Sequence, residues 1–265
     1  MKRYILRSKV KIRDVSDQYD VWAAWGDSVP ETPRQWAWAR SGVVEPLWKR
    51  DQWPWGLKDG SILDRRAPGM GKRLLVEKGS LPQETSDHEL GTPDAYTLHR
   101  ILHGVPEGQT DLPAMQAFPM ESNMDIMGGL DFRKGCYVGQ ELTVRTYHTG
   151  IIRKRILPVA IHKPEQNILE ISPSLDAPSF PTNISIQPTV VRQPDDKRTI
   201  PRPRGTGKLL SSEQGVGLAL LRLEHVEAAE RGDLRLEFNV ESGEGRGTWA
   251  VSHWWPDWWP QRPSE

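Results

Sequence analysis

Residues 131–146 of this 265-residue chain read Asp131-Phe132-Arg133-Lys134-Gly135-Cys136-Tyr137-Val138-Gly139-Gln140-Glu141-Leu142-Thr143-Val144-Arg145-Thr146. Glycine stands immediately before the cysteine and again three residues after it. The apolar spacing beyond it predicts a helix from about Gly135 or Cys136 to Tyr147, ended by Gly150. The sequence therefore places Cys136 at the point where a loop becomes a helix.

Cys136 is the one cysteine of the chain, which excludes an internal disulfide and a zinc site built from several of its thiolates. A helix N-terminus, the cations Arg133 and Lys134, and exposure each favour the thiolate, the form that binds iron and attacks electrophiles. A lone cysteine more often packs in a core, but a buried thiol gains nothing from basic neighbours. We therefore predict an exposed, easily ionised thiol, supported by Lys134 and with Tyr137 beside it.

Two kinds of chemistry fit one ionised thiol. A nucleophile needs a base, yet His148 lies twelve positions along the same predicted helix, about 18 Å away. His99 and His103 are expected on the polar face of a surface helix, and nothing in the sequence brings them to the thiol. An iron–sulfur cluster normally takes four protein ligands, so one cysteine can hold a cluster only together with a partner. The residues favour such a shared ligand.

The segments before this stretch mix short strands with one helix. A helix is predicted from about 93 to 103, because Thr92 can cap it and Pro93 suits its first position. The apolar alternation predicts strands at 4–13 and 19–25, paired as a hairpin, and shorter strands at 35–40 with 43–44, at 61–66 and at 71–77.

The segments after it predict a small β domain. Strands are expected at 151–161, 234–240 and 248–254, with a hairpin over 205–221 and a helical turn at 223–229. Short strands joined by tight turns favour an antiparallel barrel or sandwich. Proline and polar residues dominate about 172–204, which we predict to be a mobile insertion.

Composition limits the possible partners. Lys plus Arg and Asp plus Glu both number 35, so no overall field attracts nucleic acid, and no apolar run approaches the length that spans a membrane. The twelve tryptophans fall in two clusters, 22–55 and 249–259. Their rings either pack a chain that is short of aliphatic residues or stack on a flat heterocyclic ligand.

The segment Lys134–Glu141 matches the signature K-G-C-Y-x-G-Q-E, and it resembles the YgfZ family, the folate-binding relatives of the glycine-cleavage T-protein. The likeness extends to Arg100, Arg145-Thr146 and three further segments, 104–108, 119–125 and 150–155. The chain looks most like the eukaryotic branch of this family, the mitochondrial iron–sulfur cluster assembly factor, in its fungal form.

This resemblance implies an α+β fold. A T-protein (aminomethyltransferase)-like folate-binding domain is expected over 1–155, without its transit peptide and first strands. A small antiparallel β-barrel domain with the proline-rich insertion is expected over 156–265.

The resemblance also implies a function. The protein would act late in 4Fe–4S cluster maturation in the mitochondrial matrix, together with A-type scaffold proteins that carry 2Fe–2S clusters. Cys136 would be the shared cluster ligand, and Lys134, Tyr137 and Arg100 would be further cofactor-binding residues. Neither nucleic acid nor a membrane is an expected partner.

Two alternatives stay open. The first is a tetrahydrofolate-dependent aminomethyl transferase. In the enzyme, an acidic residue that grips the pterin lies two places after the arginine that corresponds to Arg100, and here that position is Leu102. An alkyl group cannot accept hydrogen bonds, so transfer is disfavoured while tetrahydrofolate stays a candidate ligand. The second is an interaction module that uses the basic strand Arg153-Lys154-Arg155, although such charge runs are usually solvated faces.

Overall fold

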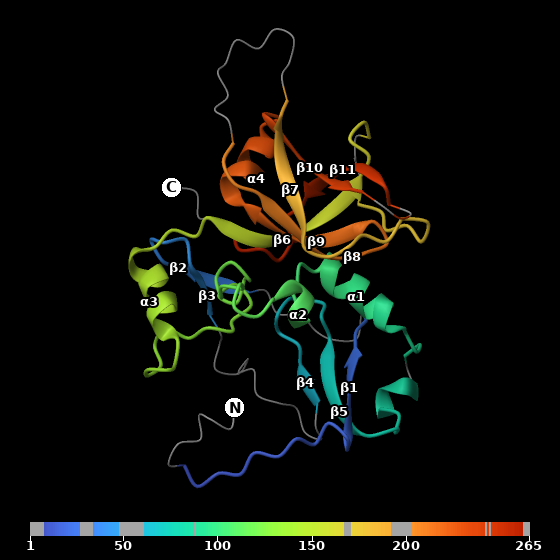
Figure 1. Ribbon diagram of the computed structural model, residues 1–265. Helices are drawn as coiled ribbons and strands as arrows, with labels where there is room; N and C mark the ends of the chain where they lie inside the picture. The colour runs from blue at the N-terminus through green and yellow to red at the C-terminus, as the bar shows by residue number, and fades with distance from the viewer. Residues whose placement is uncertain are drawn as a thin grey trace.

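The computed structural model describes residues 8–26, 34–47, 61–86, 88–166, 171–191, 203–241, 243 and 245–261. Figure 1 shows a β-barrel at the top, a three-stranded sheet at the bottom, and two helices, α1 (Pro93–Leu102) and α2 (Gly108–Asp111), between them. A hairpin of β2 (Gln35–Trp38) and β3 (Val44–Leu47) lies beside α3 (Gln140–Thr149) on the left.

The second half of the chain is a closed antiparallel barrel with the strand order β10-β11-β6-β9-β8-β7. Its strands are β6 (Lys154–His162), β7 (Ile184–Val190), β8 (Gly207–Glu213), β9 (Val216–Arg222), β10 (Leu234–Val240) and β11 (Gly247–His253). Alternate residues such as Leu157, Val159 and Phe238 are almost fully buried inside it, as the two-residue period of a strand requires. The predicted barrel is confirmed, and α4 (Leu223–Glu230) is the predicted helical turn.

The predicted mobile insertion at about 172–204 is wrong where the structure describes it. Ile184–Val190 forms β7, which pairs with β8 on one side and β10 on the other and so closes the barrel. Ile186 is completely buried. The composition of this segment does not indicate a strand, because the hydrogen bonds and the burial that offset the entropy lost on ordering it come from strands distant in sequence. Residues 192–202 lie outside the described part of the chain.

The part of the chain before the barrel strand β6, here called the front half, contains a sheet of order β1-β5-β4. It is made of β1 (Tyr19–Ala24), β5 (Lys72–Glu77) and β4 (Ser61–Leu63). The predicted hairpin between 4–13 and 19–25 is wrong, because residues 8–13 form no strand and β1 pairs with β5 instead. Residues 4–7 lie outside the described residues. Alternation alone could not identify β1's partner, which lies about fifty residues further along the chain.

Helix α1 connects the two halves. Thr92 accepts a hydrogen bond from the Ala95 amide at 3.2 Å and Pro93 is the first helical residue, as predicted. Ile101, fully buried, packs with Ile156 and Leu218 of the barrel. The first barrel strand begins at Lys154, and the division into domains at 155/156 stays a prediction.

Candidate functional site

Cys136 is exposed, as predicted, but it does not lie at the start of a helix. Helix α3 begins four residues later, at Gln140, so the predicted start near 135 or 136 is wrong. Gly139 immediately before it has a φ of 89°, a left-handed conformation that a helix cannot contain. The Gln140 side chain accepts a hydrogen bond from the Tyr137 amide at 3.1 Å and completes this turn.

This placement changes the electrostatic argument for the thiolate. The field of a helix dipole is strong only within its first turn, so α3 supports Cys136 less than the sequence suggested. The distance of about 18 Å from Cys136 to His148 also loses its basis, because the two residues do not share a helix. What the structure leaves around the thiol is its exposure and the neighbouring cations.

The structure brings Lys134 and Tyr137 together around the cysteine. The Lys134 ammonium lies 4.8 Å from the centre of the Tyr137 ring, within the range of a cation–π interaction. These two predicted site residues bracket Cys136 in sequence, so their contact keeps a positive charge on the loop that carries the thiol.

The loop is fixed at its base. Phe132 stacks on Tyr147 of α3 with ring centres 4.1 Å apart, and the Tyr147 hydroxyl donates to Glu45 of β3 at 2.8 Å. This hydrogen bond raises the pKa of Tyr147. Arg133 lies 3.9 Å from the same carboxylate, and the Ser41 hydroxyl donates to the Tyr147 carbonyl. An exposed thiol therefore lies on a loop whose base is tied to α3 and to the β2–β3 hairpin.

Arg100 is far from this loop. Figure 1 places α1 and α3 on opposite sides of the molecule. The buried Arg100 guanidinium pairs with the Asp111 carboxylate and also donates to the Val105 carbonyl at 3.3 Å and the Ser211 hydroxyl at 3.4 Å. Leu102 packs against the apolar cluster between α1 and the barrel. The structure thus unites three of the predicted site residues and leaves the fourth inside the protein.

A second polar cluster was not predicted from the sequence. Arg66 donates to Asp64 at 2.6 Å, to Glu107 at 2.6 Å and to the Tyr96 hydroxyl at 3.0 Å, and Arg73 contacts the same three groups. Burial alone would raise the carboxyl pKa values. Arg66 and Arg73 outweigh it at Asp64, and the Tyr96 hydroxyl together with the two arginines outweighs it at Glu107, so both pKa values lie below the ordinary value. Its members come from the connection after β4, from β5, from α1 and from the residue before α2, so no local sequence pattern predicts it.

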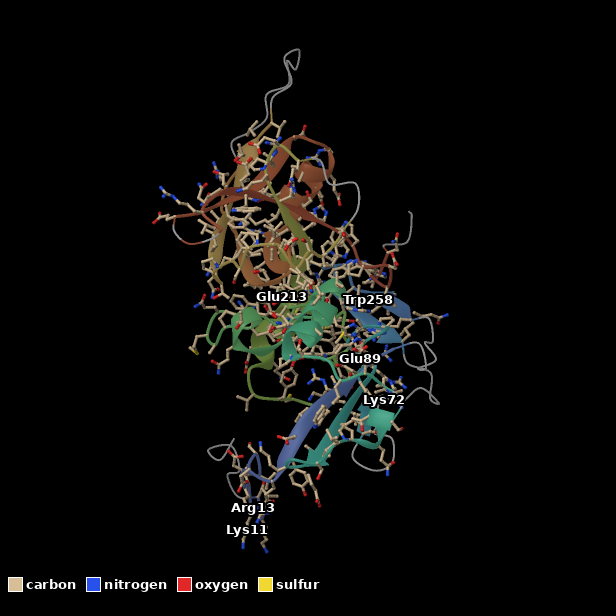
Figure 2. All side chains as sticks on the ribbon, turned by 90° about the vertical axis from the view of Figure 1, so that its right-hand side faces the viewer. Lys11, Arg13, Lys72, Glu89, Glu213 and Trp258 are labelled. Carbon is tan, nitrogen blue, oxygen red and sulfur yellow. The ribbon has the colours of Figure 1, made fainter. Side chains whose placement is uncertain are left out.

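The described tryptophans near α1 pack against protein groups. Trp25 stacks on His99 with ring centres 4.7 Å apart, and the Trp258 indole donates to the His103 carbonyl at 3.1 Å. Figure 2 shows Trp258 where the barrel meets the front half. His99 is half-buried, and its burial, with His103 beside it, lowers its pKa to about 4, so it is neutral near pH 7. These contacts favour the packing interpretation of the tryptophan clusters.

The described residues contain no group of three or more His, Cys, Asp and Glu side chains placed to hold a metal ion. Over the same residues, no helix is long and apolar enough to cross a membrane. Cys136 is an exposed thiol of the described chain, and a thiolate is the usual protein ligand of an iron–sulfur cluster.

Comparison with known proteins adds independent findings. Residues 153–261 match the family model described as the CAF17 C-terminal beta-barrel domain. A protein of Cryptococcus neoformans var. neoformans, named mitochondrial iron-sulfur cluster assembly factor IBA57 homolog, is 44% identical over 93% of this chain and 70% of its own length. Proteins of the same name from Aspergillus oryzae and Mycosarcoma maydis are 39% and 36% identical, over 95% and 98% of this chain and 56% and 62% of their own lengths.

The closed six-stranded barrel and its matching family model place the chain among proteins with a CAF17-type C-terminal barrel. More particularly, the chain belongs to the family of the mitochondrial iron–sulfur cluster assembly factor IBA57 homologues. The family resemblance seen in Lys134–Glu141 is thereby confirmed.

Proposed function

We propose that this protein is an assembly factor for iron–sulfur clusters in the mitochondrial matrix and acts late in 4Fe–4S cluster maturation. An A-type scaffold protein carrying a 2Fe–2S cluster is its partner, and Cys136 is a cluster ligand that the two proteins share. The cluster is cargo, held while the two proteins are in contact. Family membership supports the assembly function, and the partner, the compartment and the ligand role are our inferences.

The observation that carries this proposal is the exposed thiol on the anchored loop. Thiolates are the usual protein ligands of iron–sulfur clusters, and a shared cluster must be reached from outside the chain. The stacking of Phe132 on Tyr147 fixes the base of the loop without covering Cys136. The thiol is therefore held in place and still accessible to a second protein.

Sharing follows from the number of ligands. A cluster normally needs four, and the chain has one cysteine. No set of three metal-binding side chains gathers within the described residues, so the other ligands would come from the partner. This arrangement suits transfer, because the cluster leaves when the two proteins separate.

Replacing Cys136 by serine tests the proposal. The exposed substitution should change the free energy of unfolding by under about 0.5 kcal/mol. It should also abolish the visible charge-transfer absorption that forms when the wild-type chain meets a 2Fe–2S-loaded A-type scaffold, beyond that of the scaffold alone. Absorption that is the same for wild type and Cys136→Ser would overturn the proposal.

The aminomethyl transferase is not favoured. Leu102 occupies the position of the pterin-gripping acid and packs against the apolar cluster with Ile101. The Arg100 guanidinium is occupied by Asp111 and Ser211. From the resemblance we retain the proposal that the front half is T-protein-like and binds tetrahydrofolate without transferring its one-carbon group.

Tetrahydrofolate binding can be measured directly. Titrating tetrahydrofolate into the chain should change the tryptophan fluorescence saturably, because four of the tryptophans lie in the described front half. The site would be excluded if the fluorescence fell only through the inner-filter effect, as it does for free tryptophan, up to about 1 mM ligand. A dissociation constant of that size corresponds to only about 4 kcal/mol of binding free energy.

A further inference from the structure

We propose that a cavity on the barrel, beside helix α4, binds an aliphatic ammonium ion, and we name it the amine site. The cavity has a volume of about 530 Å³ and lies between α4, β10, β11 and the segment that follows β6. Figure 1 shows α4, β10 and β11 in the upper part of the molecule, whereas α3, which follows the Cys136 loop, lies on the left outside the barrel. The inference therefore does not rest on the proposed function.

The walls of the amine site suit a cation with an apolar stem. Pockets that bind small molecules usually measure about 300–1,000 Å³, and this cavity lies within that range. Pro164, Ala229 and the Trp255 ring provide apolar surface, and the carboxylates of Glu165 and Glu230 line the same cavity. An alkyl chain that ends in an ammonium group would match both kinds of surface.

Glu230 is held in place with one oxygen available to a ligand. The His253 imidazole and the Trp255 indole both donate to its Oε1 atom, at 2.9 and 2.8 Å. Among the described residues, its Oε2 atom has no hydrogen-bond partner, and the side chain is 46% exposed. The hydrogen bond from Trp255, together with that from His253, outweighs the effect of burial and lowers the pKa of Glu230. The carboxylate is therefore ionised near pH 7.

Trp255 brings an aromatic surface to the same place. Its indole N–H is fixed by Glu230, its ring packs edge-on against His253 with centres 5.6 Å apart, and the residue is still 38% exposed. A tryptophan ring attracts ammonium groups through its negative face. A carboxylate and an indole that are fixed to each other thus form two sides of a site for a cation.

The cations near the amine site are occupied elsewhere. Arg235, which lines the cavity, pairs with Glu237 at 3.5 Å, and Arg231 pairs with Asp233 at 3.1 Å. The Lys163 ammonium lies 3.6 Å from the centre of the Trp249 ring and does not line the cavity. Within the described chain, no lysine or arginine forms an ion pair with Glu165 or Glu230. An ammonium ligand would supply the missing positive charge.

The test titrates 1,5-diaminopentane into the ¹⁵N-labelled chain and follows the Trp255 indole N–H by NMR, with the signal assigned from its absence in Trp255→Phe. The diamine should shift this signal saturably, because the indole N–H donates to the carboxylate that binds the ligand. The uncharged 1,5-pentanediol, with the same stem, should not. An equal shift from the diol, or no saturable shift up to about 10 mM diamine, would overturn the site.

Matched variants test the two carboxylates. Glu230→Gln keeps an oxygen for His253 and Trp255 but removes the charge, and it should weaken diamine binding by about tenfold. Glu165→Gln should weaken it several-fold. Glu241→Gln is the control, because Glu241 is exposed and lies six residues beyond Arg235, about 20 Å along the strand direction. Equal affinities for Glu230→Gln and Glu241→Gln, with both variants folded, would overturn the site.

A second ligand identifies the source of the ammonium group. Tighter binding of the diamine than of Nα-acetyl-lysine amide would assign the site to a free polyamine, and the reverse order would assign it to a lysine side chain of another protein. Cys136→Ser should bind the diamine as the wild type does, because Cys136 does not line the cavity. The amine site can therefore fail or succeed independently of the cluster experiment.

Discussion

Replacing Arg155 by methionine is expected to lower the free energy of unfolding by about 3–5 kcal/mol, measured by urea denaturation. The Arg155 guanidinium donates hydrogen bonds to both carboxylate oxygens of Asp125, at 2.6 and 2.8 Å. The Arg155 side chain is 6% exposed and the Asp125 side chain is 0% exposed. Methionine would leave the buried carboxylate without its cation. The same guanidinium donates to the Met120 carbonyl at 2.8 Å, so the pair ties β6 to the 120–125 segment.

Two controls make this prediction specific. The double variant Arg155→Met, Asp125→Asn removes the orphaned charge and keeps an oxygen for the Val44 amide, which Asp125 now binds at 3.2 Å. It should be more stable than Arg155→Met alone. Lys78→Met breaks an exposed pair with Asp20 and should cost under about 1 kcal/mol. A loss as small for Arg155→Met as for Lys78→Met would contradict the buried ion pair.

The second large effect is expected at Gly71. Its φ is 76°, and a Cβ there would lie 2.0 Å from the Ala24 carbonyl oxygen and 2.8 Å from the Trp25 Cα. Both are backbone atoms at the end of β1, so neither can move away as a side chain would. Gly71→Ala should cost about 3 kcal/mol or more, from the strained backbone and the clash together, and lower the thermal unfolding midpoint.

Gly79→Ala is the matched control for Gly71→Ala. Gly79 has a φ of 78°, but its Cβ would meet no atom within 4 Å. This variant should cost only the left-handed strain, about 1–2 kcal/mol. The difference between the two alanine variants then measures the approach of the β4–β5 connection to β1, and equal losses would contradict that approach.

The elements that the sequence predicted well carry their own local signals. Thr92 and Pro93 mark the start of α1, and alternating apolar residues mark β10 and β11. The β8–β9 hairpin turns at Gln214-Gly215, both with positive φ. Capping, periodicity and turn geometry act over a few residues, so they can be read from the chain directly.

The errors in the predicted strands share one physical cause. β7 is held by β8 and β10, and β1 by β5, so their stability comes from segments far along the chain. Residues 8–13 alternate as a strand does but find no such partner within the described chain. Local pattern cannot rank distant partners, because pairing depends on how the whole chain is brought together.

The candidate site also has features that the sequence predicts and features that only the folded structure shows. The family, the single thiol and its exposure could be predicted from the chain alone, because Lys134–Glu141 is a contiguous motif and the residues around Cys136 act locally. Three other features needed the folded molecule: α3 starts at Gln140, Tyr147 and Glu45 fix the base of the loop, and Arg100 is paired with Asp111 inside the protein. The last two outcomes depend on burial and on pairing between residues from eleven to about a hundred positions apart, which folding brings into contact. The start of α3 follows from the left-handed conformation of Gly139, which the apolar spacing of the sequence does not reveal.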